Sequence, residues 1–154
     1  MNIEKYQELL KKFPKQRSIL SQEYQNIYNQ HYILNRGGSG FSNLLSQKME
    51  SWMHKKTSSI KGKNILELGA GNLNHIKYEI AFDNYDIVEP FSDLYKDNPY
   101  LSSVRSIFNS LEEVKCSYDK IVSIATLEHL VDLPKEVILC KKLLHKDGIF
   151  QVAV

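Results

Sequence analysis

Residues Asn64–Asn74, Asn-Ile-Leu-Glu-Leu-Gly-Ala-Gly-Asn-Leu-Asn, decide the fold of this chain. A short apolar run passes through Glu67 and then turns at Gly69 and Gly71. Such a run is typical of a buried parallel strand, and glycines directly after it let the backbone turn tightly and approach a ligand closely. The stretch therefore predicts a strand followed by a ligand-binding turn.

A second acidic residue follows at the spacing of a nucleotide-binding βαβ unit. The run Tyr85–Val88 ends in Glu89, eighteen residues after Gly71. At the tip of the second strand, this carboxylate would be placed to accept hydrogen bonds from ribose hydroxyls. Together the two features predict an adenosine-type cofactor, whereas the turn after Glu67 alone is as readily a plain strand–turn junction.

The third small residue of the motif distinguishes between cofactors. The dinucleotide fingerprint Gly-x-Gly-x-x-Gly requires glycine where this chain has Asn74, whose side chain obstructs close packing at a pyrophosphate. The stretch instead resembles motif I of the class I S-adenosylmethionine-dependent methyltransferases, (Asp/Glu)-x-Gly-x-Gly-x-Gly. Glu67, Gly69 and Gly71 match it, and Leu73 replaces the last glycine. The cofactor of that family carries a sulfonium and an ammonium, which a carboxylate at Glu67 favours electrostatically.

The second half of the chain extends the resemblance. A strand predicted over 118–124 leads into Ala125-Thr126-Leu127-Glu128-His129-Leu130, and a further strand is predicted over 149–154. This order resembles the region after strand four in the same methyltransferases. The resemblance covers about 60–154 and implies an α/β fold, a Rossmann-like, mostly parallel sheet of strands one to five flanked by helices.

A helix is predicted between those two strands, from Asp132 as its N-cap to about His145. A shorter third strand is predicted over about 103–108. The apolar positions of the helix form a wide stripe that we expect to be buried, namely Val137, Ile138, Leu139, Cys140, Leu143 and Leu144.

The resemblance also implies which residues hold S-adenosylmethionine. The glycine turn would hold its methionine end, Glu89 its ribose, and the residues after strands two and three its adenine. The family often has Asp where this chain has Asn109, whose carbonyl can still accept a hydrogen bond from the adenine amino group. The implied cofactor-binding residues are Glu67, Gly69, Ala70, Gly71, Asn72, Glu89, Pro90, Phe91, Asn109, Ser110, Ala125 and Thr126.

His129 is the candidate general base if the methyl acceptor is a hydroxyl. A packing or capping role in the turn after strand four fits its position equally well. The other histidines, His31, His54, His75 and His145, follow no pattern that assigns them a role.

Composition is that of an ordinary globular chain of 154 residues, with 42% hydrophobic and 25% charged residues. The net charge of +2 is too small to indicate nucleic acid or an anionic membrane as a partner. Cys116 and Cys140 form no Cys-x-x-Cys pair, which favours reduced thiols and no metal site. With no apolar signal core and no run of membrane-spanning length, a cytoplasmic location is expected.

The chain divides into a helical extension over 1–60 and a cofactor-binding core over 61–154. Apolar spacing predicts extension helices over about 3–13, 18–32 and 41–53. The glycine-rich stretch 35–40 between the last two is either a mobile lid or a flexible connection.

The family fold has seven strands, and this chain stops at Val154, inside the fifth. The core is therefore expected to be truncated at its C-terminus. An apolar strand over 149–154 would form an open sheet edge, which favours self-association or a partner chain.

The function that the resemblance implies is methyl transfer from S-adenosylmethionine, by direct displacement, to an unidentified acceptor that we expect to be a small molecule. One alternative is a catalytically silent S-adenosylmethionine-binding fragment that lacks the acceptor-site strands. A weaker alternative is a nicotinamide-dependent (NAD) oxidoreductase on a Rossmann sheet.

Overall fold

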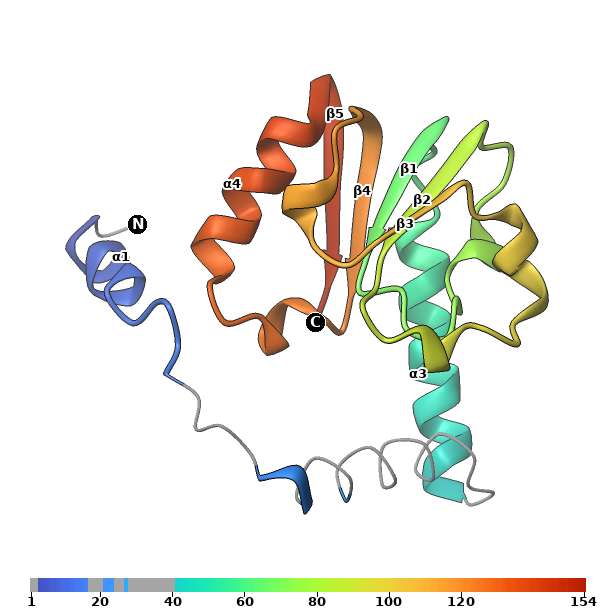
Figure 1. Ribbon diagram of the computed structural model, residues 1–154, viewed down its shortest axis with the longest axis horizontal. Coiled ribbons are helices and arrows are strands. Elements are labelled where there is room, and N and C mark those ends of the chain that lie inside the picture. The colour runs from blue at the N-terminus through green and yellow to red at the C-terminus, as the bar shows by residue number, and fades with distance from the viewer. Residues whose placement is uncertain (1–2, 17–20, 24–26, 28–40) are drawn as a thin grey trace.

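The structure, a computed structural model, describes residues 3–16, 21–23, 27 and 41–154. Its centre is a five-stranded, fully parallel sheet with strand order β3-β2-β1-β4-β5 (Figure 1). This order places the topological switch point between β1 and β4, as in Rossmann-like folds, and confirms the predicted fold class. The strands are β1 Asn64–Leu68, β2 Asn84–Val88, β3 Ser106–Phe108, β4 Tyr118–Ile124 and β5 Leu144–Ala153.

Helices cover both faces of the sheet. Helix α3 (Phe41–Thr57) lies on one face, and helix α4 (Leu133–Leu143) lies on the other (Figure 1). A short helix, α1 (Ile3–Leu10), precedes them and lies beyond α4 in the same view. Within the described ranges, no helix is both long and apolar enough to cross a membrane.

Successive side chains along each strand point to opposite faces of the sheet, and this alternation creates two apolar cores. On the α3 face, Ile65, Tyr85 and Val122 are fully buried and pack with Met53 of the helix. Leu66, Leu68, Val88 and Ile121 alternate with these positions and point to the α4 face. They form the second core together with Leu111, Val114, Tyr118 and Cys140.

Helix α4 begins as the sequence predicts, because the Asp132 side chain accepts a hydrogen bond from the Lys135 backbone N–H at 3.2 Å. The predicted width of its buried stripe is wrong. Val137 is 41% exposed and Ile138 is 55% exposed. The helix packs through the narrower row that contains Cys140, which is fully buried.

Three connections differ from the prediction. The crossover from β1 to β2 contains only a 3₁₀ helix, Ile76–Tyr78, in place of the α-helix of a βαβ unit. The third strand is shorter than expected because Pro99–Ser103 forms a 3₁₀ helix directly before it. Strand β5 starts earlier than predicted, at Leu144, and its pairing with β4 is irregular near Tyr118.

Of the predicted extension helices, the first and third are confirmed as α1 and α3. The second, over 18–32, falls mostly outside the described residues, and the glycine-rich stretch 35–40 falls entirely outside them.

Candidate functional site

The glycine turn, Gly69–Asn72, follows β1 and begins in a conformation that favours glycine. Gly69 has a φ of +75° and Gly71 a φ of +51°. A Cβ atom at Gly69 would overlap the side chain of Thr126, which follows β4. The turn therefore lies tightly against the end of β4, and only glycine fits at its first position.

Glu89 joins this turn to the end of β2. One carboxylate oxygen accepts a hydrogen bond from the Gly71 backbone N–H at 2.9 Å, and the other accepts one from the Phe91 N–H at 3.0 Å. The residue is 6% exposed. Hydrogen bonds from both sides fix the position of this carboxylate at the carboxyl edge of the sheet. The sequence-predicted proximity of the glycine turn and Glu89 is thus present.

The residues expected near adenine lie at the neighbouring strand ends. Phe91 is 65% exposed, so its ring presents a free face at the rim. The Glu89 backbone N–H donates to the Phe108 carbonyl at 2.9 Å, which brings the ends of β2 and β3 together. Asn109 is exposed, and its backbone N–H donates to the Glu113 carboxylate at 2.9 Å. Pro90 and Ser110 adjoin these residues on the same edge.

The segment after β4 supplies the remaining predicted residues. Ala125 has a φ of +52°, unusual for a residue other than glycine, and is exposed. The Thr126 hydroxyl donates to the Ile124 carbonyl at 3.1 Å and lies against the glycine turn. His129 is exposed in a 3₁₀ helix, Leu127–His129, and its backbone N–H donates to Thr126 O at 2.9 Å. These three residues share the carboxyl edge with the glycine turn.

Glu67 lies beneath the turn, and it is only 3% exposed. Burial raises the pKa of Glu67 to about 8, and the charges of Glu79 and Glu89 act in the same direction. The Tyr85 hydroxyl, which donates to Glu67 Oε2 at 2.7 Å, offsets only part of this effect. The side chain therefore carries a proton at neutral pH, in place of the charge that the sequence suggests.

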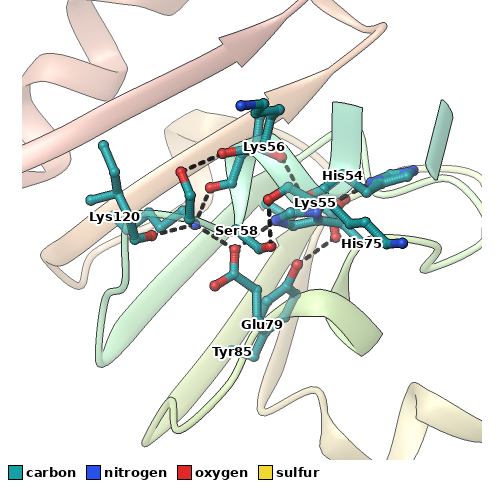
Figure 2. Close-up of polar contacts among 12 residues, drawn as sticks. His54, Lys55, Lys56, Ser58, His75, Glu79, Tyr85 and Lys120 are labelled. Carbon is teal, nitrogen blue, oxygen red and sulfur yellow. Dashed lines mark hydrogen bonds and ion pairs between the residues drawn. The ribbon is translucent and has the colours of Figure 1, made fainter. Parts of the chain in front are cut away.

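Sequence reasoning missed a buried polar cluster formed by His54, His75, Glu79 and Lys120 (Figure 2). Lys120 on β4 is 1% exposed, and its Nζ donates to Glu79 Oε1 at 2.5 Å. It also donates to the carbonyls of Thr57 and Ile60 at 2.7 and 2.8 Å, which ties the end of α3 to the sheet. A lysine on the buried face of an apolar strand was the one signal in the sequence, because such a charge requires a partner.

The same cluster holds the crossover that follows the glycine turn. His75 Nε2 lies 2.6 Å from Glu79 Oε1, and His75 Nδ1 lies 3.2 Å from His54 Nδ1 (Figure 2). Burial acts to raise the pKa of Glu79, but the hydrogen bonds from His75 and Lys120 outweigh it and hold that pKa below its ordinary value. These contacts tie the crossover to α3 and to β4.

The start of the chain reaches the segment after β4. The Lys15 backbone N–H donates to the Val131 carbonyl at 2.8 Å, and its Nζ donates to the Glu128 carbonyl at 3.0 Å. Residues next to Lys15 therefore lie beside the 3₁₀ helix that carries His129. Within the described ranges, no three His, Cys, Asp or Glu residues gather as a metal site would require.

Comparisons with known proteins bear on the fold. No protein-family model matches the chain, and no curated protein matches it. Among solved structures, it is similar to SAM-bound CalS10, an amino pentose methyltransferase from Micromonospora echinaspora involved in calicheamicin biosynthesis. The TM-score is 0.52 at 15% sequence identity, and the match covers 88% of this chain and 57% of that one. The chain thus shares the fold of a methyltransferase and spans little more than half of its length.

Proposed function

We propose that this chain binds S-adenosylmethionine at the carboxyl edge of its sheet and transfers the methyl group to a small-molecule acceptor. The observation that carries the proposal is the position of Glu89. Its carboxylate is fixed by the N–H groups of Gly71 and Phe91, at the junction of the glycine turn and the end of β2. A carboxylate at this junction of a Rossmann-like sheet is placed to accept hydrogen bonds from ribose hydroxyls.

The residues present fit such a ligand. Gly69 and Gly71 leave a turn without Cβ atoms, so backbone groups can approach the amino-acid end of the ligand. The exposed ring of Phe91 offers an apolar surface for adenine. The match to a SAM-bound methyltransferase fold supports the same assignment. When bound, S-adenosylmethionine supplies an electrophilic methyl carbon on a sulfonium.

The chemistry asks little of the protein beyond alignment and exclusion of water. The glycine turn and Glu89 would orient the cofactor, while Ala125 and Thr126 border the turn from the end of β4. For a hydroxyl acceptor, His129 is the residue of this edge that would take the proton. We propose a small molecule, and not a nucleic acid, as the acceptor.

The crossover after the glycine turn argues against NAD as the cofactor. A dinucleotide pyrophosphate is normally held at the N-terminus of the helix that follows the turn. Here the described crossover contains only the 3₁₀ helix Ile76–Tyr78. Asn74, at the position of the third glycine, also directs its side chain into a hydrogen bond with Glu50 at 2.9 Å.

Calorimetric titration with S-adenosylmethionine, S-adenosylhomocysteine and NAD tests the proposal. We expect the first two to bind and NAD to give no heat. Binding of NAD alone, or of none of the three to folded protein, contradicts it. Binding followed by methyl transfer to water-soluble hydroxyl or amine acceptors distinguishes an active enzyme from a silent binding domain.

A further inference from the structure

Asn74 ties the glycine turn to helix α3. Its side-chain Nδ2 donates to Glu50 Oε1 at 2.9 Å, only two residues after the turn ends. Between them, Leu73 is fully buried and has a φ of +57°. Because this backbone conformation is costly for leucine, it persists only where neighbouring contacts hold it. The Asn74–Glu50 contact is one such restraint.

Glu50 has a second neighbour, His54, one helical turn along α3. The same Glu50 Oε1 lies 3.5 Å from His54 Nε2. The His54 ring is buried, and its Nε2 makes no hydrogen bond within the described part of the chain. The contact between a buried ring nitrogen and a carboxylate is favourable only when the nitrogen carries a proton that it can donate.

The imidazole rings of His54 and His75 take part in three contacts. Each contact needs one proton between its two heavy atoms to be a hydrogen bond. One contact joins Glu50 to His54. The other two join His54 to His75 and His75 to Glu79 (Figure 2). Two neutral imidazoles carry two N–H protons between them. One of these protons lies on His75 Nε2, which donates a hydrogen bond to Glu79. The other lies between the two Nδ1 atoms of His54 and His75. The His54 contact with Glu50 is therefore the one left without a proton.

We propose that the His54–His75 pair binds one proton, and that this proton completes a hydrogen-bond chain that holds the glycine turn against α3. The completed chain runs from Asn74 through Glu50, His54, His75 and Glu79 to Lys120. His54 and His75 are positioning residues in this scheme, because they reach the ligand site only through Glu50 and Asn74. We call this completed hydrogen-bond chain, from Asn74 to Lys120, the clamp. The identity of the ligand rests on the proposed function, whereas the clamp itself does not.

The surrounding charges favour a single added proton and oppose a second. Two carboxylates, Glu50 and Glu79, flank the pair, and Lys120 places a positive charge on the far side of Glu79. Glu67 adds no full negative charge at neutral pH, because it is protonated. Burial, His54 and Lys120 lower the pKa of His75, although the Glu79 hydrogen bond acts against them. The added proton therefore belongs on His54, facing Glu50.

Hydrogen–deuterium exchange of residues 69–79 in the free protein tests the clamp. After correction for intrinsic exchange rates, protection of these amides should increase by up to about tenfold per pH unit as pH is lowered from above neutrality to below it, since one proton is linked. Glu50→Gln keeps an oxygen for Asn74 but removes the charge that favours the proton. We expect it to fold, because the Glu50 side chain is 43% exposed, and to lose most of this pH dependence.

His145→Gln serves as the control, because His145 is exposed and lies in strand β5, outside the clamp. This variant should retain the wild-type pH dependence. Glu67 titrates in a similar range but is present in all three proteins, so the difference between wild type and Glu50→Gln isolates the histidine pair. His54→Gln, which removes the ring that takes the added proton and cannot titrate, provides a second non-switching variant. Protection that does not rise on acidification, or an unchanged profile in Glu50→Gln, overturns the proposal.

Titration with S-adenosylhomocysteine at the same pH values separates the clamp from the ligand assignment. We expect affinity to rise with acidification over this range in the wild type and to change little in Glu50→Gln. If S-adenosylhomocysteine fails to bind at every pH while the exchange pattern is as expected, the clamp stands and the proposed function fails. If it binds with the same pH dependence in both proteins, the proposed link from clamp to ligand is wrong.

Discussion

At the scale of single residues, Gly69 is the position where the backbone most restricts which amino acid can be accommodated. Its φ of +75° and its contact with Thr126 both exclude a side chain. We expect Gly69→Ala to lower the free energy of unfolding by about 2–4 kcal/mol, the sum of left-handed strain and steric overlap. Denaturant unfolding measures the loss.

The double variant Gly69→Ala/Thr126→Gly separates the two causes. Removing the Thr126 side chain relieves the overlap but leaves the backbone strain. The double variant should therefore lose less stability than the sum of its single changes. Strictly additive losses would show that Thr126 is not the obstacle.

Glu89 is the second residue whose geometry makes a direct prediction. A glutamine there retains one acceptor oxygen and turns an NH₂ group toward the Gly71 or Phe91 N–H. We expect Glu89→Gln to weaken S-adenosylhomocysteine binding by about 1–3 kcal/mol, as leaving polar groups unpaired commonly does. Isothermal titration provides the measurement.

Asp93→Asn is the matched control for this experiment. Asp93 lies in the same loop, but its side chain is exposed and pairs with Lys96, at 2.8 Å. Its replacement should leave affinity unchanged. Equal affinity for wild type and Glu89→Gln would place the ribose elsewhere.

At the scale of elements, Lys120 joins three of them: strand β4, the end of α3 and the crossover that carries Glu79. Replacing it with methionine leaves the Glu79 carboxylate buried without its ion pair. We expect Lys120→Met to cost about 3–5 kcal/mol of unfolding free energy, as removal of one partner of a buried pair does.

Lys63→Met provides the comparison, because its pair with Asp83 is exposed and 3.9 Å long. Such surface pairs contribute about 0–1 kcal/mol, so this variant should unfold almost as the wild type does. A Lys120→Met protein as stable as Lys63→Met would mean that the buried cluster contributes little.

Local pattern predicted the elements whose form depends on near neighbours. The bounds of β4 agree with the prediction, and Asp132 caps α4 as expected, because alternation and capping are encoded within a few residues. The proximity of Glu89 to the glycine turn was also predicted, since strand ends of one parallel sheet meet at one edge.

Long-range contacts could not be predicted from the same patterns. Lys120 and Glu79 are far apart in the sequence, and nothing local indicates that they meet in the core. The exposure of Val137 and Ile138 depends on how α4 sits on the sheet, which helical periodicity alone does not fix. The crossover from β1 to β2 is likewise held by contacts that are remote in sequence, such as that of His75 with His54.

At the scale of the whole molecule, Glu67 makes stability depend on pH. Its pKa is raised to about 8 in the folded chain, above the value of 4.5 that it has when exposed. The folded state thus binds more protons than the unfolded state between these values. Stability from this group is fully present below the lower value and is lost as pH rises through the upper one.

We therefore expect the free energy of unfolding to fall by up to about 1.4 kcal/mol per pH unit as pH rises from about 7 to 8, and less steeply above that. Glu67→Gln, whose amide oxygen can still accept from Tyr85, should remove this contribution. Urea unfolding at several pH values checks it. The Glu67→Gln protein would contradict the assignment if its slope matched that of the wild type.

The two hydrogen bonds of Lys15 connect the start of the chain to the segment that follows β4. Opening of these hydrogen bonds to Glu128 and Val131 would expose the bond after Lys15 to trypsin. The segment that those carbonyls belong to starts at Thr126, against Gly69. We therefore expect a ligand bound at the carboxyl edge to slow tryptic cleavage after Lys15, a readout that needs neither a label nor a known acceptor.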